Sequence, residues 1–114
     1  LLRRQDRRAD AVKLYKKLAS DVRTKEGSAA AYYVLEDVFA GGDMDKAEKA
    51  IFAYSEREPQ AYWLAKAFIL LGDVYVRKGD NFQARATYQS VADGYSPADD
   101  GIVAEAKERI AKLN

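Results

Sequence analysis

Apolar residues recur along this chain at steps of three and four, and the pattern repeats itself. The dipeptide Gly-Asp occurs at 42–43 and again 37 residues later at 79–80. After each dipeptide an alanine, Ala47 or Ala84, begins an apolar ladder with steps of four and three. Such steps place side chains on one face of an amphipathic helix. A period of this length indicates stacked supersecondary units rather than one closed globule.

The same spacing predicts about six helices joined by short connections. They are expected at 4–22, 28–40, 44–58 and 59–78, then from 80 or 81 to 95, and from 96–97 or 99 to the end of the chain. Ser28 and Asp43 are expected helix caps, because their side-chain oxygens can accept hydrogen bonds from the first turn. No stretch alternates apolar and polar residues between turn signals. The predicted fold class is therefore all-α, with successive helices forming antiparallel hairpins.

Each predicted helix has an apolar stripe that is expected to be buried. In chain order the stripes consist of Ala11, Tyr15, Leu18 and Val22; Ala31, Val34, Leu35 and Val38; Ala47, Ile51 and Tyr54; Phe68, Leu71, Gly72 and Tyr75; Ala84, Tyr88, Val91 and Tyr95; Ile102, Ala106, Ile110 and Leu113. Glycine at 41–42 and at 79 is expected to end the second and fourth helices, because glycine adopts the left-handed conformation without steric cost.

The composition is that of one folded domain. Among 114 residues, 48% are hydrophobic and 32% are charged, which suffices for a packed core with a solvated exterior. No apolar run approaches the roughly 20 residues that cross a bilayer, and no signal-like segment opens the sequence. Because the chain begins at Leu1 in helix-like sequence, we expect it to be a segment of a longer protein.

The residues that commonly perform catalysis or bind metals are scarce. Cysteine and histidine are absent, which removes thiolate and imidazole chemistry. The neighbouring acids Glu36 and Asp37, like Asp99 and Asp100, point to different sides of a helix, so they do not form a catalytic pair. The aspartates around Asp93 and Asp99 lack the alternating ligands of a calcium loop, and helix capping explains them better. We expect no enzyme activity, no cofactor and no metal.

Charge is unevenly distributed along the chain. Residues 1–25 carry nine Lys or Arg and three Asp, whereas residues 26–114 carry ten Lys or Arg and fifteen Asp or Glu. Arg3, Arg4, Arg7 and Arg8 would share a broad helix face that could meet phosphates or an acidic partner. The alternative is a solvated face or a junction with a neighbouring repeat. The absence of interleaved aromatic residues favours this alternative.

One part of the sequence resembles a known repeat family. Over 65–97 the chain is similar to the tetratricopeptide repeat, and the resemblance is carried by Phe68, Leu71, Gly72, Tyr75, Gly79, Ala84, Tyr88 and Pro97. Small residues at Gly72 and Ala84 let the two helices of a hairpin cross closely, while Tyr75 and Tyr88 fill the spaces beside the crossing. A looser copy covers 31–59, with Leu35 where the family prefers glycine.

The resemblance implies a right-handed α-solenoid that forms a single domain over 1–114. Its units would be a half repeat at 1–27, repeats at 28–59 and 60–97, and a C-terminal capping helix at 98–114. The period of 37 residues, against about 34 in the family, resembles the tetratricopeptide proteins of the bacterial cell envelope. It therefore implies a periplasmic or outer-membrane-associated location rather than a cytoplasmic one.

In this family the first helix of each hairpin lines a concave groove that binds a partner. The solvent-facing residues at these positions are Tyr32, Glu36, Phe39, Lys66, Ile69, Asp73, Val76, Arg77, Glu105, Glu108 and Lys112. Lys66, Arg77 and Lys112 could hold an acidic side chain or a carboxylate. The alternatives are ordinary surface ion pairs for the cations, Lys66 with the neighbourhood of Asp73 and Lys112 with Glu108, and packing against the next hairpin for the apolar residues. Trp63 is expected to be a wedge between hairpins.

The function that these observations favour is that of a non-catalytic scaffold. We expect it to bind a peptide or protein segment on the concave helical surface, next to other repeats of the parent chain, and to have no small-molecule substrate. A second hypothesis is binding of nucleic acid or an acidic partner through the basic first helix. Loss of affinity with rising salt would support that hypothesis.

Overall fold

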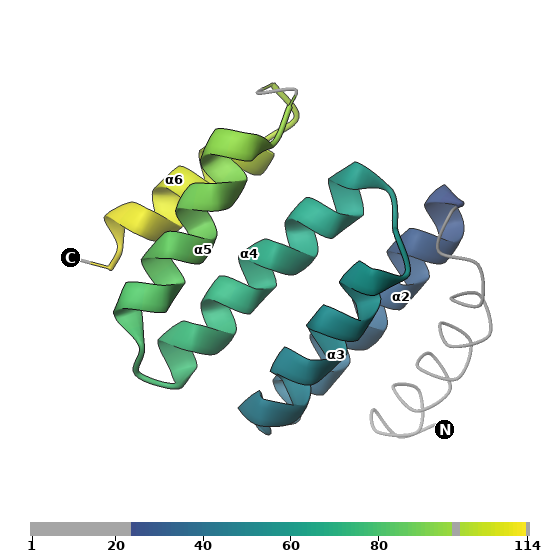
Figure 1. Cartoon of the computed structure of the whole chain (residues 1–114), viewed down its shortest axis with the longest axis horizontal. Helices are drawn as coiled ribbons and strands as arrows, with labels where there is room; N and C mark the ends of the chain where they lie inside the picture. Colours follow the sequence, from purple (N-terminus) through teal and green to yellow (C-terminus); the bar gives the residue numbers. More distant parts are fainter. Residues whose placement is uncertain (1–23, 97–98, 114) are drawn as a thin grey trace, which may run out of the picture.

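A computed structural model describes residues 24–96 and 99–113, and this part of the chain is all-helical (Figure 1). Its helices are α2 (Lys25–Ala40), α3 (Met44–Glu56), α4 (Ala61–Arg77), α5 (Asn81–Gly94) and α6 (Ile102–Ala111). Those two ranges contain no strand. The predicted all-α class is confirmed for these residues. The helix predicted at 4–22 and the basic cluster at 3–8 lie outside the described residues.

The turn between the two helices of a hairpin is built in the same way twice. Gly42 and Gly79 have φ values of 94° and 81°, in the left-handed region that favours glycine. In each case the next residue caps the following helix: Asp43 Oδ1 accepts from the Lys46 backbone N–H at 3.1 Å, and Asp80 Oδ1 accepts from the Gln83 N–H at 3.0 Å. The repeated dipeptide of the sequence is thus a repeated structural device.

Three predicted helix boundaries are wrong. The second helix begins at Lys25, because Thr24 Oγ1 accepts from the Gly27 N–H at 2.9 Å and caps it. The fourth begins at Ala61 rather than at residue 59, and the sixth begins at Ile102, after Gly101 with a φ of 92°. The predicted stripes are otherwise buried at their centres, although Val34, Val38, Phe68 and several terminal members are only half-buried.

Ser28 connects three elements instead of capping one helix. It is fully buried inside α2. Its backbone carbonyl accepts from the Tyr54 hydroxyl on α3 at 2.8 Å, and its Oγ accepts from the Gln60 N–H, just before α4, at 3.0 Å. Because buried polar groups need partners, these bonds fix the first hairpin against the start of the second.

The central helix is α4, which contacts α2, α3, α5 and α6. Its buried residues therefore surround its axis: Ala65, Ala67, Ile69, Leu70, Leu71, Gly72, Val74 and Tyr75. A helix that is apolar on all sides is a buried helix. The single stripe predicted for this segment was too narrow.

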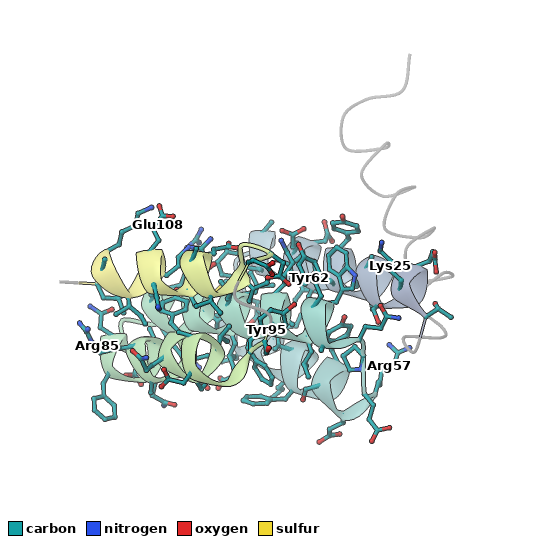
Figure 2. The ribbon with its side chains drawn as sticks, turned by 90° about the horizontal axis from the view of Figure 1, so that it is seen from above. Lys25, Arg57, Tyr62, Arg85, Tyr95 and Glu108 are labelled. Carbon is teal, nitrogen blue, oxygen red and sulfur yellow. The ribbon has the colours of Figure 1, made fainter. Side chains whose placement is uncertain are left out.

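The helices lie side by side with alternating direction along the chain (Figure 1). Viewed from above, α2 and α6 lie on one side of the molecule and α3 and α5 on the other (Figure 2). Contacts join α2 to α4 and α4 to α6, whereas α3 and α5, within the described part, do not touch. None of the described helices is long and apolar enough to cross a membrane.

Buried tyrosines make the fold sensitive to alkaline pH. Burial raises the pKa of Tyr54 and of Tyr75 to about 12, with Glu48 adding to the shift at Tyr75, and burial also raises the pKa of Tyr32 and Tyr88. A raised pKa means that the folded state holds protons that the unfolded state releases above a pH of about 10. Stability should therefore be lost as the pH rises from about 10 towards these folded pKa values.

We expect tyrosine ionisation, followed by ultraviolet absorbance, to include a steep step that coincides with loss of helical circular dichroism. Independent titration of every tyrosine near a pH of about 10, with the helices intact, would contradict the expectation.

Candidate functional site

Four aromatic side chains from two hairpins meet at one place, which we call the aromatic cluster: Tyr32 and Tyr33 of α2 and Tyr62 and Trp63 of α4. The centroid of the Trp63 ring lies 5.6 Å from that of Tyr32, 5.8 Å from Tyr33 and 5.1 Å from Tyr62. These are favourable separations for tilted and edge-to-face pairs. Trp63 packs between the hairpins, as predicted. Tyr33 and Tyr62 are 40% and 36% exposed.

Lys66 lies over this cluster. Its Nζ is 5.6 Å from the Tyr32 ring centroid, 5.8 Å from Tyr62 and 6.0 Å from Trp63. Helix geometry explains the arrangement, because residues three and four positions apart share a face of α4. The half-buried ammonium is thus held by three ring faces. The pairing of Lys66 near Asp73, suggested as an alternative, is not found.

A second cation on α4 has a similar environment. The Arg77 guanidinium carbon lies 5.0 Å from the centroid of the half-buried Phe39 ring on α2. Val76, next to it, is 40% exposed. Ring contacts between α4 cations and α2 aromatics therefore occur at both ends of the α2–α4 contact.

Two predicted groove residues are buried instead. Ile69 is 3% and Tyr32 is 7% exposed, so the prediction that they face solvent is wrong and the packing alternative holds for both. They lie where α2 and α4 contact each other. The Tyr32 hydroxyl donates to Glu36 Oε2 at 3.4 Å. Glu36 itself is exposed on α2.

Asp73 forms part of the packing between helices. It accepts a hydrogen bond from the Tyr88 hydroxyl of α5, and both of its oxygens lie 3.0 Å from Nη1 of Arg109 on α6. Nη2 of Arg109 also donates to Glu105 at 3.2 Å. Burial raises the pKa of the Asp73 carboxyl, and the Tyr88 hydrogen bond and the Arg109 charge oppose this effect. No sequence pattern predicts this link among three helices, because its members lie far apart along the chain.

Glu108 and Lys112, the last of the residues predicted to contact a partner, are ordinary surface residues. Lys112 Nζ pairs with Glu108 Oε1 at 3.1 Å, and the two side chains are 69% and 66% exposed. This is the surface ion pair suggested as the alternative, and pairs of this kind contribute little to stability.

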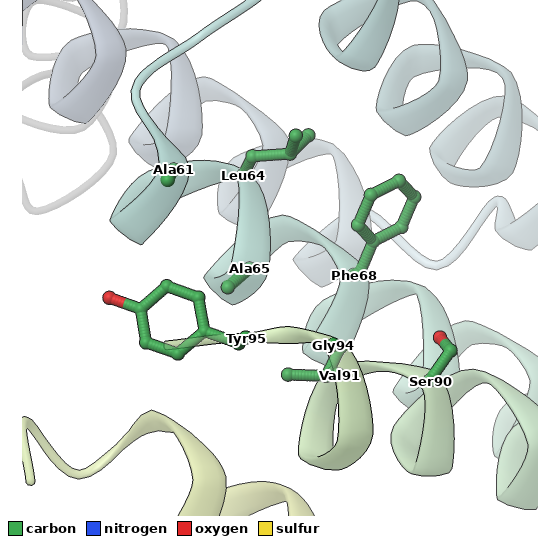
Figure 3. Close-up of a pocket in the computed structure, with 8 residues that line it drawn as sticks. All are labelled: Ala61, Leu64, Ala65, Phe68, Ser90, Val91, Gly94 and Tyr95. Atoms are coloured by element: carbon green, nitrogen blue, oxygen red, sulfur yellow. The ribbon is translucent and has the colours of Figure 1, made fainter. Parts of the chain in front are cut away.

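An apolar pocket of about 310 Å³ opens between α4 and α5 (Figure 3). Its lining consists of Ala61, Leu64, Ala65, Phe68, Ser90, Val91, Gly94 and Tyr95. Small residues at 61, 65 and 94 leave the hollow, and Leu64 and Phe68 form a wall. This pocket was not predicted from the sequence. The small residues on the facing sides of α4 and α5 were the available sequence signal for this pocket.

The described side chains include groups that can bind a ligand. Within 24–96 and 99–113, no group of three or more acidic residues could hold a metal ion. Exposed rings and ring-held cations can bind apolar, aromatic or anionic groups. Lys66 and Arg77 are the strongest candidates, because no carboxylate of the described residues pairs with either of them.

Comparison with protein-family models, with curated proteins and with solved structures finds no match for this chain.

Proposed function

We propose that the chain is a non-catalytic protein interaction module, a tetratricopeptide-like right-handed solenoid. The surface formed by α2, α4 and α6 would bind a peptide or protein segment. The architecture is supported by the contacts of the first helices, α2 with α4 and α4 with α6, while the second helices α3 and α5 stay apart. A curved stack with one hollow side needs this arrangement. The repeated turn at Gly42 and Gly79 also supports it.

The observation that carries the binding proposal is the aromatic cluster with its cation. Tyr62 keeps more than a third of its surface exposed beside Trp63, and Lys66 lies over both rings without a carboxylate partner among the described residues. Large aromatic side chains next to a positive charge are typical anchors of interfaces. A surface that served only for packing between hairpins would not need to leave these groups accessible.

Selection from a random peptide library, with the protein as bait, tests the proposal. We expect enriched peptides to lose about tenfold in affinity for Tyr62→Ala, because an aromatic anchor at an interface often contributes that much. Phe82→Ala is the matched control, since Phe82 is 84% exposed on α5, away from the cluster. It should bind as the unmodified protein does.

Both variants should stay folded in helical circular dichroism, with a lower melting temperature for Tyr62→Ala because it loses the edge-to-face contact with Trp63. If no peptide is enriched over a bait-free control, the proposal is wrong. It is also wrong if the two variants weaken binding equally.

A further inference from the structure

Lys66 and Arg77, the two cations of α4, differ from Arg109 and Lys112, which have carboxylate partners. Arg109 is paired with Asp73 and Glu105, and Lys112 with Glu108. Lys66 and Arg77 instead lie over aromatic rings contributed by α2, and no ion pair joins either of them to a carboxylate of the described residues. Each is thus a positioned positive charge whose hydrogen-bonding groups remain available to a ligand.

The two cations share one face of α4. They are eleven residues apart, which is about three turns and about 16 Å along the helix axis. Their partners on α2, Tyr32 and Phe39, are seven residues apart and so also share a face. Lys66 and Arg77 therefore mark the two ends of one line, which we call the α2–α4 seam.

A negative charge lies between these ends. Glu36 follows Tyr32 by one turn of α2, and its carboxylate, exposed to solvent, accepts a hydrogen bond only from the Tyr32 hydroxyl among the bonds of the described residues. Asp73 lies between the cations on α4, where Arg109 pairs with both Asp73 and Glu105, so this group of three keeps one negative charge. The order of charge along the seam is therefore positive, negative, positive. A continuous polyanion would place a negative charge next to the Glu36 carboxylate, which would repel it.

We propose that the seam binds an extended peptide segment with two acidic residues about four positions apart, on the same side of the peptide, and a basic residue between them. This inference rests on the function proposed above and specifies its ligand. An extended chain advances about 3.3 Å per residue and its side chains alternate between two sides, so acids four positions apart point to the same side at a spacing of about 13 Å. The flexible side chains of the acids and of the two cations cover the rest of the ~16 Å along the α4 axis. The rings hold both cations in place before binding, which lowers the entropy cost of capturing the acids.

Three labelled peptides of equal length test the inference by fluorescence polarisation. The probe contains Glu-Ala-Lys-Ala-Glu, the second peptide has the same composition with its two acids adjacent, and the third is a glutamate homopolymer. We expect the probe to bind about tenfold more tightly than either of the others, since only the probe satisfies all three charges. Its affinity should fall with rising ionic strength.

Variants of the protein connect the binding to the seam. Lys66→Gln and Arg77→Gln should each lower the affinity for the probe about tenfold. Lys46→Gln, which removes an exposed cation on α3, should have no effect. Lys66→Arg keeps the charge over the rings and should stay within about threefold of the unmodified protein. Glu36→Gln should remove the preference for lysine in the middle of the probe.

The possible failures are distinguishable. Equal affinity for the spaced and adjacent acids, or equal effects of Lys66→Gln and Lys46→Gln, overturns this inference. Library peptides that depend on Tyr62 but contain no spaced acids also overturn it, while leaving the proposed function intact. If no peptide binds in either experiment, both proposals are wrong.

Discussion

Replacing Gly72 by leucine is expected to lower the free energy of unfolding by about 3 kcal/mol or more. Gly72 faces the ring of Tyr88 where α4 crosses α5. A Cβ at this position would lie 2.6 Å from Cδ1 and 2.7 Å from Cζ of that ring, and closer still to Cε1. The ring cannot move aside easily, because Tyr88 is 1% exposed and its hydroxyl is bonded to Asp73. The two helices must therefore separate.

Thermal and denaturant unfolding measure this effect, and a loss of that size should lower the melting temperature by more than about 10 °C. Gly94→Ala is the matched control, because Gly94 is also helical but nothing lies within 4 Å of its added Cβ. This control should be neutral or stabilising by up to about 1 kcal/mol. An unchanged melting temperature for Gly72→Leu would mean that the helix crossing is not as described.

A double-mutant cycle separates the steric clash from other effects. Gly72→Ala alone should destabilise through contact with the Tyr88 ring, and Tyr88→Leu alone should destabilise through the lost ring. Combined, they should cost clearly less than the sum of the two, since the smaller side chain gives space to the new methyl group. Additive losses would contradict a direct contact between these positions.

The features that the sequence predicts well are local ones. Gly42 and Gly79 are needed for positive φ, and Asp43 and Asp80 for the caps that follow. Each is determined within a few residues of its own position. The same holds for the ladder that begins at Ala47, whose alternating steps define a buried stripe on α3.

The errors arise where burial depends on a second neighbour. The apolar spacing of the α4 sequence predicts one buried stripe, which leaves Ile69 on the groove side. In the structure α4 has neighbours on several sides, and Ile69 and Val74 are buried among them. A run of apolar residues around the whole helix was the available signal. Ser28 shows a related error. Its residue type predicts a helix cap, whereas in the structure its buried hydroxyl joins two hairpins.

The candidate site was predicted only as a set of positions on the first helices. Trp63 was identified as a wedge between hairpins, and the structure places it there. The position of Lys66 over rings from both hairpins could not be predicted, because it depends on how α2 and α4 align. The Arg109 contact with Asp73 likewise requires α6 to lie beside α4.

The link between Asp73 and its two partners should be the most sensitive polar contact of the second hairpin. We expect Asp73→Ala to lower the free energy of unfolding by about 2 kcal/mol, because it leaves the buried Tyr88 hydroxyl without an acceptor and Arg109 without its main partner. The side chains of Asp73 and Arg109 are 25% and 32% exposed, so water recovers part of the loss. The effect therefore stays below that of breaking a fully buried ion pair.

Two further variants test this reasoning by their rank order in denaturant unfolding. Asp73→Asn keeps an oxygen that can accept from Tyr88 but loses the charge, so its cost should be about half that of Asp73→Ala. Lys112→Ala breaks an ion pair whose two side chains are mostly exposed, so its cost should be below about 0.5 kcal/mol. If Asp73→Ala costs no more than Lys112→Ala, solvent satisfies these groups. The contact among α4, α5 and α6 would then depend on apolar packing around Tyr88 and Ala106 alone.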